Sequence, residues 1–135
     1  MLLAFLALAS IGTISAQAGG PSHRIVFQVA SADTLEHKML MRQLNNALAT
    51  APDASIEVVC HGPGLDMILG DRTIVHKAIS ALKERGIQFL ACENSLKERK
   101  IARDLVIAEA GSVPAAIIHI VERQVEGWSY IKAGF

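Results

Sequence analysis

Three short runs of mostly apolar residues recur along the chain, each bounded by residues that favour turns. They span residues 24–30, 55–60 and 87–92 and contain the β-branched and aromatic side chains that favour strands. Apolar residues in each run are close to continuous, whereas a strand with one solvated face would alternate them with polar residues. The pattern therefore predicts strands buried on both faces, as in a parallel sheet covered by helices.

The segments between these runs carry apolar residues at the spacing of one helix face. The positions are Leu40, Leu44, Ala47 and Leu48 after the first run, and Val75, Ala78, Ile79 and Leu82 after the second. Asp33 or Thr34 can cap the first of these helices, and residues 51–53 end it. Gly86 stands where the C-cap glycine of the second helix belongs. Each of the first two strands is therefore followed by a helix.

The last third of the chain continues this alternation. Ser95 and Glu98 are spaced as a capping box, which predicts a third helix from there to about Arg103. Residues 112–113 mark a short fourth strand, a last helix follows, and residues 128–132 predict a terminal strand. The apolar spacing in the last helix predicts that its buried stripe consists of Ile118, Val121 and Val125.

This order of elements predicts a single domain over residues 23–135, because no repeat or linker divides the sequence. Apolar strands that alternate with helices form a mainly parallel sheet with helices on both faces. We therefore expect a three-layer α/β/α sandwich with a flavodoxin-like sheet of about five strands. In that strand order, the second and third strands lie on either side of the first.

Residues 1–18 differ from the rest of the chain in having no charged side chain. An apolar stretch that ends in Ala16, Gln17 and Ala18 has the pattern of a secretory signal with a small-residue cleavage site. Polar residues interrupt this stretch before the ~20 residues that a membrane span needs, and an uncleaved anchor is the alternative. We expect cleavage near Ala18, a flexible lead-in at residues 19–22, and a periplasmic or secreted protein with no stable membrane insertion.

Composition narrows the classes of partner and site. The 13 Lys and Arg residues equal the 13 Asp and Glu residues, so the chain lacks the basic excess typical of nucleic-acid-binding proteins. Aromatic residues make up 4% of the sequence, too few for platforms that stack single-stranded nucleic acid. Two cysteines are too few for a disulfide scaffold, and the five histidines show no metal-ligand spacing. We expect no metal and no cofactor.

Two polar segments follow predicted strands, and parallel sheets bind ligands beyond the carboxyl ends of their strands. Residues 61–64, with the sequence HGPG, follow the second strand, and a segment that starts at Cys92 follows the third. The glycines of the first segment permit a tight turn, and His61 could serve the site as a hydrogen-bond partner or a proton acceptor. The candidate residues at this edge are Cys60, His61, Gly62, Cys92, Asn94 and Ser95.

Cys92 is the candidate catalytic residue, and a buried structural cysteine is the alternative that its position alone leaves open. Unpaired N–H groups at a helix N-terminus favour a thiolate or a persulfide. Glu93 opposes this effect, whereas basic residues on the following helix add positive potential. These are Lys97, Arg99, Lys100 and Arg103. If the first strand separates the second and third, their ends lie ~9.6 Å apart. A disulfide needs Cα atoms within ~7 Å, so we expect Cys60 to be a core residue.

Segments distributed along the chain resemble the DsrE/DsrF-like family of small sulfur-relay and related proteins. The similarity covers residues 23–132 and is most specific at residues 61–64, 91–95 and 126–132. It implies a three-layer α/β fold that assembles into trimers or hexamers. In the sulfur-relay members, a cysteine after the third strand accepts sulfane sulfur as a persulfide and passes it to a partner, and Cys92 stands at the matching position. The supporting residues at motif positions are His61, Gly62, Asn94 and Ser95.

The sequence leads to three hypotheses of function. The first is an exported sulfur carrier that uses Cys92 and exchanges sulfur with a donor or acceptor protein. The second is a non-catalytic oligomeric module whose pocket binds a small ligand or peptide. The third is a thiol–disulfide redox protein in which Cys60 resolves Cys92. The third predicted helix is short and highly charged and has no continuous apolar stripe, so it cannot cover a sheet face well. We therefore also expect apolar surface within residues 106–110 and 128–131 to lie between subunits.

Overall fold

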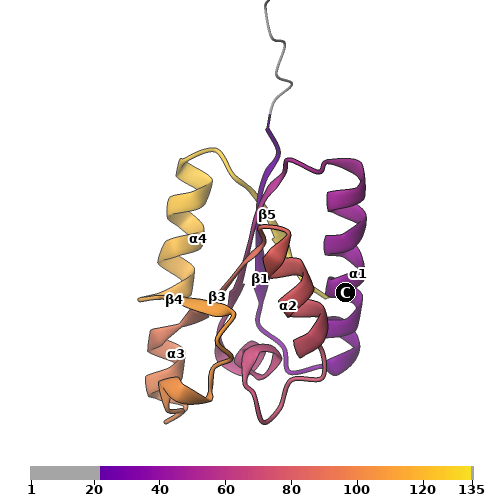
Figure 1. Cartoon of the computed structure of the whole chain (residues 1–135). Helices are drawn as coiled ribbons and strands as arrows, with labels where there is room; N and C mark the ends of the chain where they lie inside the picture. Colours follow the sequence, from indigo (N-terminus) through magenta and orange to yellow (C-terminus); the bar gives the residue numbers. More distant parts are fainter. Residues whose placement is uncertain (1–21, 135) are drawn as a thin grey trace, which may run out of the picture.

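A sheet of five parallel strands runs through the centre of the molecule (Figure 1). The structure is a computed structural model and describes residues 22–134. The predicted signal at residues 1–18, and the predicted lead-in up to residue 21, lie outside the described residues. In chain order the elements are β1 (Arg24–Val29), α1 (Thr34–Thr50), β2 (Ser55–Cys60), the 3₁₀ helix η1 (Gly62–Ile68), α2 (His76–Glu84), β3 (Gln88–Cys92), α3 (Glu93–Glu98), the 3₁₀ helix η2 (Arg103–Leu105), β4 (Ala110–Val113), α4 (Ala116–Val125) and β5 (Ser129–Lys132).

The strands lie side by side in the order β4-β3-β2-β1-β5. The predicted α/β/α sandwich with about five parallel strands is confirmed, but the expectation that β2 and β3 flank β1 is wrong. The chain steps from β1 to β4 in one direction, and β5 then adds to the free side of β1. Both orders are built from the same strand–helix units, so the sequence pattern does not distinguish them. As a result, the carboxyl ends of β2 and β3 are adjacent.

One face of the sheet carries the larger hydrophobic core, beneath α1 and α2 (Figure 1). The helix residues that the apolar spacing predicted to face inward are buried or partly buried there. The buried ones are Leu40, Leu44, Leu48, Val75, Ile79 and Leu82. The predicted cap of α1 is also confirmed, because the Asp33 side chain accepts a hydrogen bond from the Leu35 N–H at 2.7 Å.

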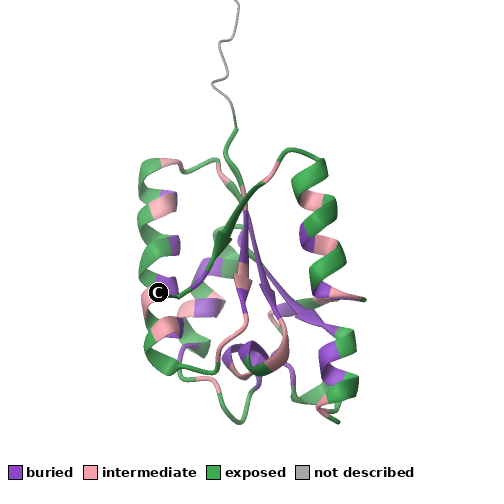
Figure 2. Ribbon diagram, turned by 180° about the vertical axis from the view of Figure 1, so that it is seen from behind, coloured by how far each residue is buried: buried purple, intermediate pink, exposed green. Residues whose placement is uncertain are grey.

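The other face is covered by α4, and the orientation of this helix corrects the prediction. The three residues predicted to form its buried stripe are exposed, at 57% for Ile118, 49% for Val121 and 83% for Val125. Figure 2 shows exposed residues along the outer side of α4. The helix instead turns Ala116 and Ile120 inward onto a smaller core. The side of α4 that faces the sheet also carries His119 and Arg123.

A buried carboxylate explains this orientation. Glu57 in β2 is 1% exposed and accepts hydrogen bonds from His119 at 2.7 Å and from two nitrogens of Arg123 at 2.7 and 3.0 Å. Burial alone would raise the pKa of Glu57, but hydrogen bonds and charge attraction from Arg123 and His119 hold it below its usual value. Because an unpaired buried charge is strongly unfavourable, α4 places His119 and Arg123 against Glu57. Its exposed side then carries Ile117, Ile118, Val121 and Val125.

The helix α3 starts earlier and is shorter than predicted. It begins at Glu93, so Ser95 lies inside the first turn and the predicted capping box does not form. Lys100 adopts the left-handed conformation, with φ of 53°, and the Ile101 N–H donates to the Leu96 carbonyl at 2.9 Å. This is a Schellman C-cap formed without glycine. The sequence therefore carried no glycine signal for the end of α3.

The segment after α3 packs within the chain. Val106, Ile107 and Ala110 are buried in the core beneath α1 and α2. Residues 106–110 consequently offer little apolar surface to another subunit, in contrast to the expectation. Tyr130 and Ile131, on the edge strand β5, do remain exposed. The helix α4 carries four further large apolar residues that are exposed, namely Ile117, Ile118, Val121 and Val125.

Candidate active site

A pocket of about 240 Å³ lies at the carboxyl ends of β2 and β3, where the sequence predicted the site. Its walls come from the residue after β2, the end of β3, the helix α3 and the start of α4. The lining residues are His61, Cys92, Asn94, Ser95, Glu98, Ala115, Ala116 and Ile117. Four predicted site residues are thus brought together, and the contribution of α4 was missed because the sequence does not show which helix packs beside β3.

Cys60 takes no part in this pocket, as predicted, although the geometric reason differs. Its strand is adjacent to β3, and Cys60 pairs in register with Ala91. Cys92 is one residue further along, so the two side chains project to opposite faces of the sheet. Cys60 belongs to the core beneath α1 and α2, where burial raises the pKa of its thiol. Both cysteines are free thiols in the structure.

The Cys92 thiol lies where α3 and α4 begin, and its Sγ accepts a hydrogen bond from the Ala116 N–H at 3.3 Å. Burial alone would raise the pKa of this thiol. Hydrogen bonds from the Ser95 hydroxyl, and from the backbone N–H groups of Ser95, Ala116 and Asn94, more than offset burial and lower the pKa. A larger fraction of Cys92 is therefore thiolate at neutral pH than in a free cysteine, and the thiolate is the nucleophilic form.

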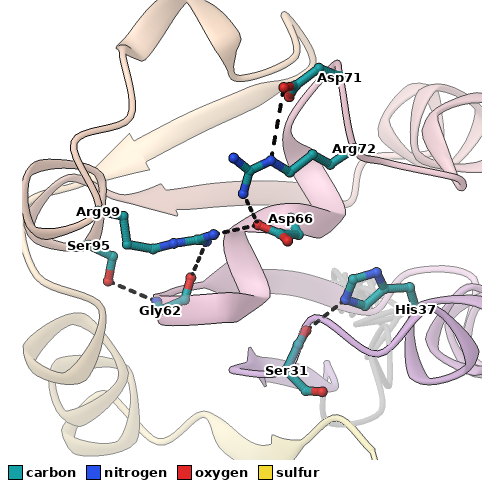
Figure 3. A network of polar contacts seen from close by, with 8 residues as sticks. All are labelled: Ser31, His37, Gly62, Asp66, Asp71, Arg72, Ser95 and Arg99. Atoms are coloured by element: carbon teal, nitrogen blue, oxygen red, sulfur yellow. Dashed lines mark hydrogen bonds and ion pairs between the residues drawn. The ribbon is translucent and has the colours of Figure 1, made fainter.

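Ser95 connects this thiol to the HGPG segment. Its Oγ accepts a hydrogen bond from the Gly62 N–H at 2.9 Å (Figure 3). The hydroxyl hydrogen is therefore left for Cys92. The side chain is 6% exposed, so few water molecules compete for the hydroxyl. Gly62 thereby fixes the Ser95 hydroxyl in an orientation that stabilises a negative charge on sulfur.

An ion-pair network holds Gly62 in place (Figure 3). Arg99 donates to the Gly62 carbonyl at 2.8 Å and to Asp66 at 2.8 Å, and Arg72 reaches the same carboxylate at 3.0 Å. Burial would raise the pKa of Asp66, but its bonds to Arg99 and Arg72 lower it. Arg99 was expected to add positive potential at Cys92. Its guanidinium is instead bound to η1, and the roles of Asp66 and Arg72 were not predicted.

His61 is hydrogen-bonded to Gln28, and Gln28 to Tyr130, two residues that the sequence did not predict to belong to the site. The Nε2 atom of Gln28 lies 2.7 Å from the Nε2 atom of His61, and the Tyr130 hydroxyl donates to Oε1 of Gln28. Burial lowers the pKa of His61. A polar residue inside the apolar run 24–30 was the available signal for Gln28, whereas the position of Tyr130 depends on β5 pairing with β1.

A larger groove of about 710 Å³ lies between α1 and α2, away from the strand ends. It is lined by apolar side chains and by Lys38, Arg42 and Lys77, and its lining contains no cysteine, serine or threonine. Within residues 22–134, three metal-ligating side chains do not converge at any point. The helices in this part of the chain also lack the length and apolar content needed to cross a bilayer.

Comparisons with known proteins identify the family and the fold of the chain. The sequence model of the DsrE/DsrF-like family matches residues 15–133. Among solved structures, the chain is similar to MTH1491 from Methanobacterium thermoautotrophicum, a protein of unknown function, with 30% identity and a TM-score of 0.78 over 82% of this chain and 99% of that one. It shares its fold with BT1422 from Bacteroides thetaiotaomicron, also of unknown function, with 15% identity and a TM-score of 0.65 over 81% and 93% of the two chains. No curated protein matches the sequence.

Proposed function

Because this chain belongs to the DsrE/DsrF-like family, we propose that it is a sulfur carrier in which Cys92 holds the transferred sulfur as a persulfide. The observation that carries the proposal is the environment of the thiol, which opens into a pocket and has a lowered pKa. A structural cysteine in a core has the opposite character, as Cys60 does. The donors around Sγ favour both a thiolate and the anionic terminal sulfur of a persulfide.

The transfer step needs no oxidant. The Cys92 thiolate attacks the terminal sulfur of a donor persulfide, R–S–S–H, so that a new bond to Sγ forms while the S–S bond of the donor breaks. The donor leaves as the thiolate R–S⁻, and Cys92 becomes Cys92–S–S–H, which then loses its proton to solvent. An acceptor thiolate removes the same sulfur by the reverse exchange. Charge and oxidation state balance across each exchange.

Intact mass spectrometry after incubation with inorganic polysulfide tests the proposal. We expect a mass gain of about 32 Da, one sulfur atom, that dithiothreitol reverses. The gain should disappear in Cys92→Ser and persist in Cys60→Ala, which is the matched control because Cys60 is the other of the two cysteines. A gain that survives Cys92→Ser, or no gain in the natural sequence, would rule out a carrier that uses Cys92.

The second candidate function is a non-catalytic binding module of the same fold. Ala115, Ala116 and Ile117 give the pocket an apolar wall beside Cys92, which suits a small ligand. Alkylation by iodoacetamide across a pH series separates the two candidates, because the carrier requires a thiol that reacts below the pH range of a free cysteine. The third hypothesis, a Cys60–Cys92 redox pair, is disfavoured because the two side chains lie on opposite faces of the sheet.

We further propose that the chain assembles through the outer side of α4 into a trimer or hexamer. Exposed apolar residues follow one another along this helix, and isolated surface helices rarely carry them so densely. The residues are Ile117, Ile118, Val121 and Val125. Since Ile117 also lines the Cys92 pocket, a second subunit seated here would border the site.

Export is a separate proposal that rests on the uncharged segment at residues 1–18. We propose that this segment directs the protein to the periplasm or the extracellular space and is removed near Ala18. N-terminal sequencing of protein purified from each cell fraction tests this. Protein that keeps Met1 and stays in the cytoplasm would contradict it.

A further inference from the structure

Three strands contribute to one chain of hydrogen bonds that ends at the Cys92 pocket. The Tyr130 hydroxyl, on the edge strand β5, donates to Oε1 of Gln28 on β1. The Nε2 atom of the same amide lies 2.7 Å from Nε2 of His61, the first residue after β2. β1 lies between β5 and β2, so Gln28 is the residue that bridges them. His61 then lines the pocket with Cys92.

The chemistry of the amide decides the state of the imidazole. An amide nitrogen can only donate, so Nε2 of His61 must accept, and the proton of the neutral ring must lie on Nδ1. In the structure the Tyr130 hydroxyl donates to Oε1 of Gln28, so the amide presents its nitrogen to His61. Burial lowers the pKa of His61 and so also favours the uncharged ring. Among the described residues, Nδ1 has no hydrogen-bond partner, which leaves its N–H for a ligand.

This arrangement gives His61 a different role from that of a base. Its accepting nitrogen is occupied by Gln28, so the ring cannot take a proton from Cys92 through that atom. The thiolate is stabilised instead by Ser95 and by backbone N–H groups. The acidic residue Glu98 also lines the pocket and repels an anion, so an anionic ligand needs a donor such as Nδ1–H to offset this repulsion.

From these contacts we propose that Gln28 and Tyr130 are positioning residues that hold His61 as a neutral hydrogen-bond donor, through which the pocket selects an anionic sulfur group. The identification of the ligand as a sulfur group rests on the carrier function proposed above. The protonation state of His61 and the preference of the pocket for an anion are independent of that function, and both can be measured without a sulfur donor.

Nitrogen NMR tests the first part, because the ¹⁵N shifts of histidine distinguish the two neutral tautomers from the cation. We expect His61 of the natural sequence to be the Nδ1–H tautomer at pH 7. Gln28→Glu replaces the donating amide with an accepting carboxylate, which should place a proton on Nε2. Tyr130→Phe frees the amide to turn and should give a mixture of states. An Nε2–H tautomer in the natural protein would overturn the proposal.

Alkylation tests the second part with two probes that undergo the same reaction at Cys92. Iodoacetate is anionic and iodoacetamide is neutral, so the ratio of their rates reports preference for an anion independently of the thiolate fraction. We expect His61→Phe, which removes the Nδ1–H donor without adding a charge, to lower this ratio by about three- to tenfold, the size expected for one hydrogen bond. The matched control is His76→Phe, an exposed histidine of α2 outside the pocket. Equal ratios in the two variants would overturn the proposal.

These outcomes are separable from the carrier function. A protein with the expected tautomer and rate ratio that gains no sulfur from polysulfide would retain the role of Gln28 and Tyr130 and lose the carrier proposal. A protein that gains sulfur but shows the Nε2–H tautomer would support the carrier proposal and overturn the role of Gln28 and Tyr130.

Discussion

At the scale of single residues, Ser95 determines how the thiol behaves. It lies inside α3, receives the Gly62 N–H and supplies a hydrogen bond to Cys92. We predict that Ser95→Ala moves the pH profile of Cys92 alkylation to higher pH and slows iodoacetamide at pH 7 by about tenfold. The reason is that a hydrogen bond to a charged group is worth ~1.5–3 kcal/mol. Ser80→Ala, a serine of α2 outside the pocket, is the control, and an unchanged profile in Ser95→Ala would contradict the assignment.

The two glycines of the HGPG segment are needed for different reasons, Gly64 for lack of space and Gly62 for its backbone conformation. A Cβ at Gly64 would lie 2.1 Å from the carbonyl oxygen of Val29, so the backbone of β1 or η1 would have to move. Gly62 has open space around it but φ of 52°. We predict that Gly64→Ala lowers the free energy of unfolding by about 3 kcal/mol or more, and that Gly62→Ala lowers it by about 1 kcal/mol. Urea unfolding measures both, and equal effects would contradict this distinction.

At the scale of elements, the end of α3 depends on a lysine in a conformation that favours glycine. Lys100 holds the left-handed position of the Schellman cap with φ of 53°. We predict that Lys100→Gly raises the free energy of unfolding by about 1 kcal/mol, because the cost of that conformation disappears. Lys97→Gly, inside the same helix, should lower it by about 1 kcal/mol. Two changes of the same sign would show that the cap does not control the helix end.

The attachment of α4 depends on the ionised state of Glu57. Because the folded-state pKa of Glu57 is lowered, its contribution to stability is present above the ordinary glutamate value of 4.5 and is lost as the pH falls through the folded-state pKa. Glu57→Gln leaves Arg123 without its buried partner and should cost about 3 kcal/mol at pH 7. Urea unfolding at several pH values should show this difference shrinking below pH 4.5. A difference that stays constant would mean that Glu57 is not ionised in the folded protein.

At the scale of the whole molecule, the outward apolar side of α4 is expected to become buried by assembly. We predict that Val121→Glu converts a trimer or hexamer into a monomer, because a carboxylate would be desolvated at the interface. The control is Leu35→Glu on α1, where the original side chain is 51% exposed, close to the 49% of Val121. Sedimentation equilibrium measures both variants. A full-length chain, with residues 1–18 retained, that sediments as a 14.5 kDa monomer would contradict this interface, and so would a control that dissociates equally.

Many features of the fold follow from interactions between residues that are close together in the sequence. The strands β1, β2 and β3, the inward faces of α1 and α2, the Asp33 cap and the position of Cys92 at a strand end all follow from residues close together in the chain. Apolar periodicity and helix caps depend on residues within a few turns of one another, so both can be recognised in the sequence alone. The family motif at residues 61–64 and 91–95 likewise pointed to both sides of one pocket.

What only the tertiary structure decided involves groups far apart in the chain. The strand order placed Cys60 and Cys92 on neighbouring strands but on opposite faces. Glu57 determines which side of α4 faces the sheet through its contacts with Arg123 and with His119, which is 62 residues away in the sequence. An unpaired buried carboxylate is more unfavourable than exposed valines. The route from Tyr130 through Gln28 to His61 spans 102 residues in its first step. Hydrophobic spacing specifies that a helix has an apolar side, whereas the charges buried beneath it decide which side faces the sheet.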